Sequence, residues 1–132
     1  MRSAMPRIFP SLLLCLCLGA APVYAGGDAK TGAAVFRKCG ACHTATEPNN
    51  RVGPSLMGLI GRPVASVPDY SYSDAMRAFG AEGHVWDEPT LSEYLLSPKA
   101  MVGGTKMSFV GLRKPQDIAD VIAYLKDPSA AK

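Results

Sequence analysis

The residues with the most evident chemistry are Cys39, Cys42 and His43, in the run Cys39-Gly40-Ala41-Cys42-His43. Two thiols three residues apart, with a histidine directly after the second, are typical of c-type haem attachment. On one helical turn the two thiols can reach the vinyl groups of a haem and become thioethers. The histidine then lies under the iron, where haem proteins commonly use this residue as a ligand. The motif therefore predicts one covalently bound haem.

Other functions of a Cys-x-x-Cys pair stay open on the motif alone. A thioredoxin-like redox pair would need a βαβ pattern around it, and the sequence has no strand-like runs. A zinc site would need two further ligands at metal spacing, whereas the other cysteines and histidine are Cys15, Cys17 and His84. A structural disulfide between Cys39 and Cys42 is a third alternative.

The first 25 residues have the character of an export signal. Arg2 and Arg7 give a short positive region, residues 8–18 form an apolar core, and compact side chains stand where a signal peptidase cuts. We expect cleavage after Ala25, leaving residues 26–132 as one domain in the periplasm, without stable membrane insertion. An uncleaved anchor is the alternative, although the apolar stretch is shorter than the ~20 residues of a spanning helix.

Charge gives no reason to expect nucleic-acid binding. The full chain of 132 residues has 14 Lys and Arg against 11 Asp and Glu. Without Arg2 and Arg7 the balance is 12 against 11, a net charge of +1, which two haem propionates would bring slightly below zero. Only the placement of the charges can then matter for partners.

Helical patterns predict a small all-α domain of three to four helices with long loops wrapped around the haem. The expected helices are Asp28–Lys38, Asp74–Phe79, Asp87–Leu96 and Pro115–Lys126. Asp28 and Ser73 are expected caps, and Gly80 is the expected stop of the second helix. The clearest apolar stripes are Ala29, Ala33 and Phe36 in the first helix, Leu91, Tyr94 and Leu95 in the third, and Ile118, Val121, Ile122 and Leu125 in the last.

The remaining segments are expected to be loops: 44–73 is rich in glycine and proline, and 99–114 contains Gly103, Gly104 and Gly111. Loops this long fit a compact domain when they wrap a ligand. A covalent haem would also supply the large apolar staple that so small a domain needs.

A six-coordinate haem needs a second axial ligand opposite His43. The candidates are His84, Met57, Met76, Met101 and Met107. Methionine usually fills gaps in a core, but Met107 ends the flexible run Gly103-Gly104-Thr105-Lys106 rather than lying on an apolar helical face. A thioether favours reduced iron and raises the reduction potential. His84 is expected to be a surface histidine.

Ordered matches over nearly the whole expected mature chain resemble the class I cytochromes c of mitochondrial type and their soluble bacterial relatives. The matches run from Gly32 to Leu125 and include Cys39-x-x-Cys42-His43-Thr44, Gly53-Pro54-Ser55-Leu56, Tyr70-Ser71-Tyr72-Ser73-Asp74, Tyr94-Leu95, Gly104-Thr105-Lys106-Met107 and Ala123-Tyr124-Leu125. This resemblance implies a small cytochrome c fold around one haem c bound through Cys39 and Cys42.

The resemblance also implies a role for each site residue. His43 and Met107 would be the axial ligands, and the Pro54 carbonyl would orient the His43 ring. Arg62, Tyr72 and Trp86 would hydrogen-bond one haem propionate, and Thr105 would hydrogen-bond the other. Tyr94 would bond the Met107 sulfur. Phe36 and Tyr124 would pack the first helix against the last. A buried carboxylate needs such convergent donors.

Three departures from the family pattern bear on the haem pocket. Met76 stands where family members often have asparagine, residues 80–85 form a slightly longer stretch, and Gly103 replaces a proline before Gly-Thr-Lys-Met. Since glycine leaves the backbone more freedom, we expect a weaker bond from Met107 to iron than in relatives with that proline.

With both axial positions filled by protein, substrate cannot easily reach the iron, which favours one-electron transfer over enzymatic catalysis. We expect a monomeric periplasmic carrier in a respiratory or photosynthetic chain. It would take electrons from a cytochrome bc complex or a dehydrogenase and deliver them to a terminal oxidase, peroxidase or reaction centre. Two alternatives stay open: a haem enzyme or gas-binding protein with a free sixth position, and a redox domain stably bound to a dehydrogenase.

By the same resemblance, basic residues ring the exposed haem edge and would steer redox partners with acidic docking surfaces. These residues are Lys38, Arg51, Lys99, Lys106, Arg113 and Lys114. Association would then be transient and sensitive to salt. Ordinary solvated surface is the alternative interpretation of the same residues.

Overall fold

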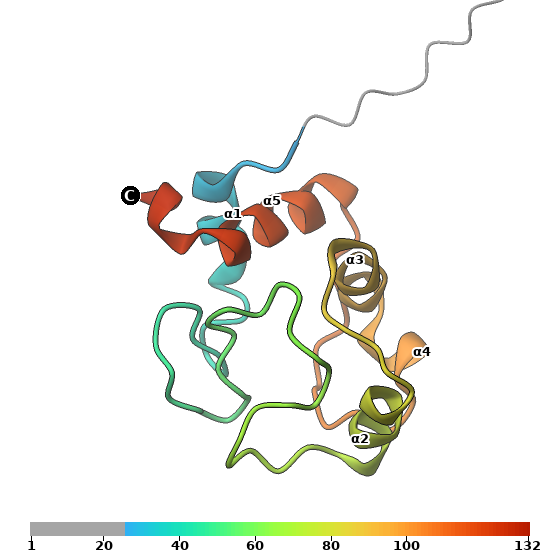
Figure 1. Cartoon of the computed structure of the whole chain (residues 1–132). Helices are drawn as coiled ribbons and strands as arrows, with labels where there is room; N and C mark the ends of the chain where they lie inside the picture. The colour runs from blue at the N-terminus through green and yellow to red at the C-terminus, as the bar shows by residue number, and fades with distance from the viewer. Residues whose placement is uncertain (1–25) are drawn as a thin grey trace, which may run out of the picture.

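The computed structural model describes residues 26–132, so the predicted export signal at 1–25 lies outside the described residues (Figure 1). The elements are α1 Ala29–Phe36, α2 Asp74–Ala81, α3 Glu88–Leu96, α4 Pro98–Met101, α5 Pro115–Lys126 and the 3-10 helix η1 Pro128–Ala131. The only β-pairing within 26–132 is one isolated antiparallel bridge between Pro63 and Val85. The all-α prediction is confirmed, with five α-helices among the described residues rather than three to four.

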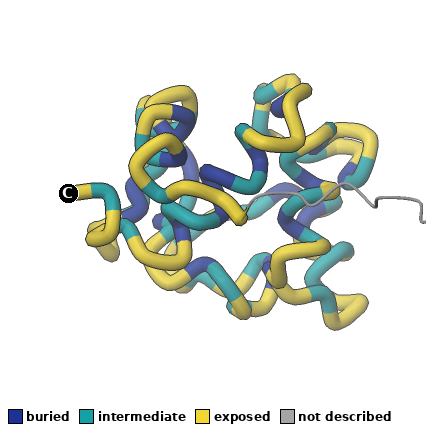
Figure 2. Tube along the Cα trace, turned by 90° about the horizontal axis from the view of Figure 1, so that it is seen from above, coloured by how far each residue is buried: buried dark blue, intermediate teal, exposed yellow. Residues whose placement is uncertain are grey.

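The helices surround an interior that a long loop closes on one side (Figure 1). The first helix α1 packs against α5, α5 also contacts α3, and α3 continues into α4. Residues 37–73 have no helix and sweep around the remaining side. Buried residues gather along the inner side of the chain, and the outer side is exposed (Figure 2). In the part of the chain that the structure describes, no helix has the length and apolar character to cross a membrane.

The contact between α1 and α5 depends on glycine. A Cβ at Gly32 would lie 1.9 Å from the Asp120 carbonyl oxygen, so only glycine lets the helices approach this closely. The rings of Phe36 and Tyr124 meet beside this contact, with centroids 5.2 Å apart. The predicted apolar face of α1 is wrong in part: Phe36 is buried as expected, Ala29 and Ala33 are only partly buried, and the other buried residues are Gly32 and Val35.

The ends of α1 and α2 differ from prediction for local reasons. Asp28 caps α1 as expected, but the helix ends at Phe36 and turns follow up to Cys42. Ser73 caps α2 through a bond from the Met76 amide, but Gly80 lies inside this helix. A Cβ at Gly80 would lie 2.6 Å from the Val64 carbonyl oxygen, so this glycine serves packing and not termination. The residue past the helix end with positive φ is Gly83, at +87°.

Two later helices follow their predicted patterns and one was missed. Asp87 accepts a hydrogen bond from the Thr90 amide at 2.9 Å and caps α3, and α5 has the predicted bounds with its apolar stripe buried. The predicted loop at 99–114 is wrong over its first residues, because Pro98 occupies the first turn of α4 as well as following the end of α3. Proline suits that position, since its missing N–H has no helical acceptor there.

Candidate functional site

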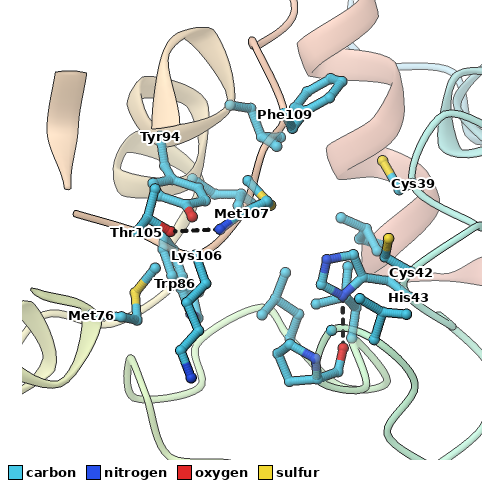
Figure 3. Close-up of a pocket in the computed structure, with 18 of the residues that line it drawn as sticks. Cys39, Cys42, His43, Met76, Trp86, Tyr94, Thr105, Lys106, Met107 and Phe109 are labelled. Carbon is cyan, nitrogen blue, oxygen red and sulfur yellow. Dashed lines mark hydrogen bonds between the residues drawn. The ribbon is translucent and has the colours of Figure 1, made fainter. Parts of the chain in front are cut away.

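A cavity of about 530 Å³ lies between the long loop and the helices, in the size range of small-molecule and cofactor sites. Its walls come from segments far apart in the sequence. All ten residues that the sequence analysis assigned to the site line this one cavity: Cys39, Cys42, His43, Pro54, Arg62, Tyr72, Trp86, Tyr94, Thr105 and Met107. Figure 3 shows the cysteines and His43 on one side and Met107, Tyr94 and Thr105 on the other.

The cysteine motif forms a tight turn that continues the chain from α1. The amide of Cys39 donates to the Phe36 carbonyl at 2.8 Å, and the amide of His43 donates to the Cys39 carbonyl at 2.9 Å. Both cysteines are free, so the disulfide alternative is not formed here. Burial raises the pKa of the Cys39 thiol. Within residues 26–132 no group of three His, Cys, Asp or Glu side chains is placed to hold a metal ion.

The His43 ring is held from two sides. Its Nδ1 lies 2.8 Å from the Pro54 carbonyl oxygen and donates to it, which leaves Nε2 free (Figure 3). Burial lowers the pKa of His43, so the imidazole is neutral at neutral pH, the form that binds iron. A Cβ at Gly53 would lie only 2.3 Å from the ring carbon Cε1. The backbone of Gly53 therefore packs directly against the His43 ring, a contact that the sequence did not predict.

Met107 lies across the cavity from His43 (Figure 3). Its amide donates to the Thr105 hydroxyl at 3.3 Å, which fixes the chain just before the sulfur-bearing side chain. Tyr94 is 6% exposed; burial raises the pKa of its hydroxyl, and a hydrogen bond with the Thr105 side chain partly offsets this. The Tyr94 hydroxyl thus meets Thr105 in this structure, and its bond to the Met107 sulfur stays a prediction.

Of the other candidate axial ligands, only Met76 lines the cavity. Met76 is buried at the wall formed by α2, displaced to one side of the space between His43 and Met107 (Figure 3). Met57 is 45% exposed, and neither it nor Met101 lines the cavity. His84 stacks on Phe79 with ring centroids 4.0 Å apart, away from the cavity lining.

A polar corner of the cavity is built around Arg62. The guanidinium donates to the carbonyl oxygens of Ser55 at 2.9 Å and Met57 at 3.1 Å. A guanidinium has five N–H donors, so others stay available toward the cavity. Tyr72 accepts a hydrogen bond from the Val67 amide at 3.2 Å, and its own hydroxyl hydrogen is left to donate. Trp86 is 8% exposed, lines the cavity and packs on Tyr94, with ring centroids 4.9 Å apart.

This donor set fits a covalent haem. Two free thiols and one neutral imidazole stand on one wall, a thioether stands on the opposite wall, and apolar side chains lie between them. The polar corner offers donors where the carboxylates of the cofactor would otherwise be buried without partners.

The cytochrome c family model matches residues 29–128 of this sequence. The chain belongs to the cytochrome c family. As a member of it, the chain is an electron carrier with a haem c bound covalently through Cys39 and Cys42. The resemblance to class I cytochromes c is thereby confirmed.

Individual relatives of this cytochrome c come from both bacteria and eukaryotes. Cytochrome c2 from Afifella marina is 51% identical over 96 residues, covering 72% of this chain and 77% of that protein. Cytochrome c from Gibberella zeae is 50% identical over 105 residues, covering 78% of this chain and 96% of that protein. Cytochrome cH from Methylobacterium extorquens has a similar structure, with a TM-score of 0.69, 40% identity and coverage of 76% and 98% of the two chains.

Proposed function

We propose that this cytochrome c is a periplasmic one-electron shuttle whose iron is ligated by His43 and Met107. The observation that carries the proposal is the placement of these two side chains on opposite walls of the cavity that also holds both thiols (Figure 3). When bound, the haem supplies a site that accepts and releases one electron. With both axial positions taken by protein, substrate has no place at the metal, and the chain is not an enzyme.

The other site residues orient and charge-balance the cofactor. The Pro54 carbonyl sets the direction of the His43 ring and increases the basicity of the ligand nitrogen. With haem bound, Arg62, Tyr72 and Trp86 would donate to one propionate and Thr105 to the other, which would offset the cost of burying carboxylates. Tyr94 would then donate a hydrogen bond to the Met107 sulfur.

Electrons enter and leave at the cavity mouth, through transient contact with acidic partners. Lys38 and Lys106 line the cavity together with the exposed Val52, which is 77% exposed. Lys38 lies 3.9 Å from Asp117 and Arg51 lies 3.7 Å from Glu47, and such exposed pairs are weak enough to open for a partner.

We propose as donors a cytochrome bc complex or a dehydrogenase, and as acceptors a terminal oxidase, peroxidase or reaction centre. The chain acts as a monomer.

The absorption spectrum of the purified protein tests the ligation. We expect sharp bands in the reduced protein, a weak sulfur-to-iron band at the red end in the oxidised protein, and no change with carbon monoxide. A high-spin spectrum, or a shift with carbon monoxide, would overturn Met107 ligation and favour a haem protein with an open site. Fractionation and N-terminal sequencing of the native protein test the location: a membrane-bound chain that starts at Met1 would contradict export with cleavage after Ala25.

A further inference from the structure

One peptide unit beside the His43 ring is hydrogen-bonded at both of its ends. Its carbonyl oxygen, that of Pro54, accepts a bond from His43 Nδ1 at 2.8 Å (Figure 3). Its N–H, which belongs to Ser55, donates to the side-chain oxygen Oδ1 of Asn50 at 2.9 Å. Because resonance delocalises electrons over the whole unit, a stronger bond at the N–H makes the carbonyl oxygen more negative. Asn50 and the His43 ring are therefore connected through one polarisable group.

The Asn50 side chain is held at both of its polar atoms. Its Oδ1 faces the Ser55 amide, and its Nδ2 donates to the Pro68 carbonyl at 3.3 Å, in a segment 18 positions further along the chain. An N–H needs an acceptor and a carbonyl needs a donor, so these two partners decide which side-chain atom is the oxygen. The side chain of the adjacent Asn49 is exposed and makes no hydrogen bond among residues 26–132. Of these two adjacent asparagines, Asn50 is therefore the one connected to the site.

Ser55 is also fixed by bonds that do not involve Asn50. It is 4% exposed, its carbonyl accepts a bond from the Arg62 guanidinium at 2.9 Å, and its hydroxyl donates to the Glu47 carbonyl. These bonds continue to hold Ser55 when the Asn50 acceptor is removed. Loss of that acceptor therefore changes the charge on the Pro54 oxygen more than it changes the position of this oxygen.

Hydrogen bonds that follow one another in a chain polarise each other, which strengthens each of them by roughly 10–30%. The Asn50 acceptor thus strengthens the bond from His43 Nδ1 to Pro54, and a ring whose N–H is drawn away is a more basic ligand. A more basic ligand favours oxidised iron. We propose that Asn50 is a positioning residue which acts through the Pro54–Ser55 peptide to raise the basicity of His43 and lower the reduction potential. This inference rests on the proposed ligation by His43.

Two substitutions of Asn50 separate this electronic effect from a structural one. Asn50→Ala removes both bonds of the side chain, whereas Asn50→Asp loses the donor to Pro68 but gives the Ser55 amide a charged and stronger acceptor. A purely structural role would shift both variants in the same direction, because both lose the bond to Pro68. Asn49→Asp is the matched control, since it adds the same charge one position away without contact to the peptide.

The readouts at pH 7 are the reduction potential and the Nδ1 proton resonance of His43 in the reduced, diamagnetic holoprotein. We expect Asn50→Ala to increase the reduced-to-oxidised ratio at a fixed solution potential by up to about twofold, as for a 10–30% change in one hydrogen bond. Its Nδ1 proton should move upfield, because the bond to Pro54 weakens. Asn50→Asp should shift both quantities in the opposite direction, and by more than Asn49→Asp does.

Shifts of the same sign in both Asn50 variants, or an Nδ1 resonance that neither of them moves, would overturn the proposal. If Asn50→Ala does not fold, the comparison of Asn50→Asp with Asn49→Asp decides alone, and equal shifts in these two would overturn it. Failure of the proposed ligation has a separate signature: in the oxidised wild type, the His43 ring resonances would lack the large shifts that a bound iron causes. The Nδ1 resonances of the reduced variants would then still decide whether Asn50 polarises the Pro54 carbonyl.

Discussion

The two walls of the cavity are built in different ways. The histidine wall, which carries Cys39, Cys42 and His43, is held by hydrogen bonds to backbone atoms. The amides of Gly53 and Leu56 donate to the carbonyls of Cys42 and Thr44, and the Pro54 carbonyl accepts a bond from the His43 ring. The methionine wall is the glycine-rich loop of residues 103–109. Besides one local backbone bond, from the Thr105 amide to the Val102 carbonyl, its hydrogen bonds use the side chains of Thr105 and Lys106. One proposed axial ligand, His43, is thus part of a hydrogen-bonded frame, and the other, Met107, is carried by a segment that few contacts fix.

This difference separates two tasks. The histidine wall carries the covalent bonds, and its hydrogen bonds hold Cys42 and His43 in one frame. The methionine wall needs only to supply one soft ligand, and its strength of binding can change without loss of the cofactor. Substitutions on the histidine wall should therefore change the free energy of unfolding. Substitutions on the methionine wall should change the binding of Met107 to iron and the absorption spectrum.

The largest effect is expected from Met107→Ala. This variant should keep the haem attached, because the thioethers lie on the other wall, but should lose the low-spin spectrum and bind carbon monoxide when reduced. Mass spectrometry and spectra with and without carbon monoxide measure the two properties. Met57→Ala is a control, since Met57 is 45% exposed and does not line the cavity. An unchanged low-spin spectrum in Met107→Ala would assign the ligand to another side chain, with Met76 the first to test.

Gly53→Ala should destabilise the holoprotein by about 1–3 kcal/mol, because the added Cβ overlaps the His43 ring and the wall cannot move away. Its matched control on the other wall is Gly103→Ala, where a Cβ would have no atom within 4 Å. Guanidinium unfolding of both variants gives the comparison. Equal stability of the two variants would mean that the histidine wall is not the more rigid one.

Gly103→Pro should strengthen the bond from Met107 to iron. Gly103 does not have positive φ, and Val102 before it is extended at φ −124° and ψ 85°, which suits a residue that precedes proline. The lost backbone freedom of the released state is worth about 0.4–1 kcal/mol, so the alkaline midpoint of the sulfur-to-iron band should rise by about 0.3–0.7 pH unit. A midpoint already high in the wild type, and unmoved by proline, would contradict the expected weakness of this loop.

The smallest effects are expected at two matched helix caps. Hydrogen bonds from Thr31 lower the pKa of Asp28, which caps α1 before the cysteines, and those from Thr90 lower the pKa of Asp87, which caps α3 before Tyr94. Because the folded-state pKa of each carboxyl is lowered, ionisation stabilises the folded protein at pH values above the unfolded pKa of 3.8. This stabilisation is lost as the pH falls through the folded-state pKa. Asp28→Asn and Asp87→Asn should therefore lower the melting temperature at pH 6 more than at pH 3.

For each of these variants, an equal decrease in melting temperature at pH 6 and pH 3 would show that the carboxylate charge contributes nothing to stability. If the walls differ as described, Asp87→Asn should also affect the sulfur-to-iron band slightly more than Asp28→Asn, because α3 carries Tyr94 on the methionine wall.

Elements with a strong local period could be predicted closely. The α5 helix has the predicted bounds because its apolar stripe and its first-turn proline are both local signals. The sequence did not predict the structural roles of two glycines and one proline. Gly80 is a packing residue inside α2, Gly32 allows α1 to approach α5, and Pro98 starts a helix as well as following one.

The site shows the same division. The sequence motif and the family resemblance assign ten residues that do line one cavity, because each carries a recognisable side chain. The contact of Gly53 with the His43 ring could not be predicted, since glycine has no side chain whose chemistry would indicate a contact. The tie from Lys106 to Ser71 joins residues 35 positions apart through a backbone carbonyl, and no residue type marks such an acceptor.

The close crossing of α1 with α5 has a consequence for the order in which this protein matures. Chain synthesis proceeds from the N-terminus, so α1 and the cysteine motif emerge while their packing partner, residues 115–126, is still missing. The Gly32 contact to Asp120 joins segments 88 positions apart, and contacts so distant in sequence form late. Val121 and Leu125 of α5 line the cavity together with Phe36, so the cavity is complete only once the C-terminal segment has packed against α1.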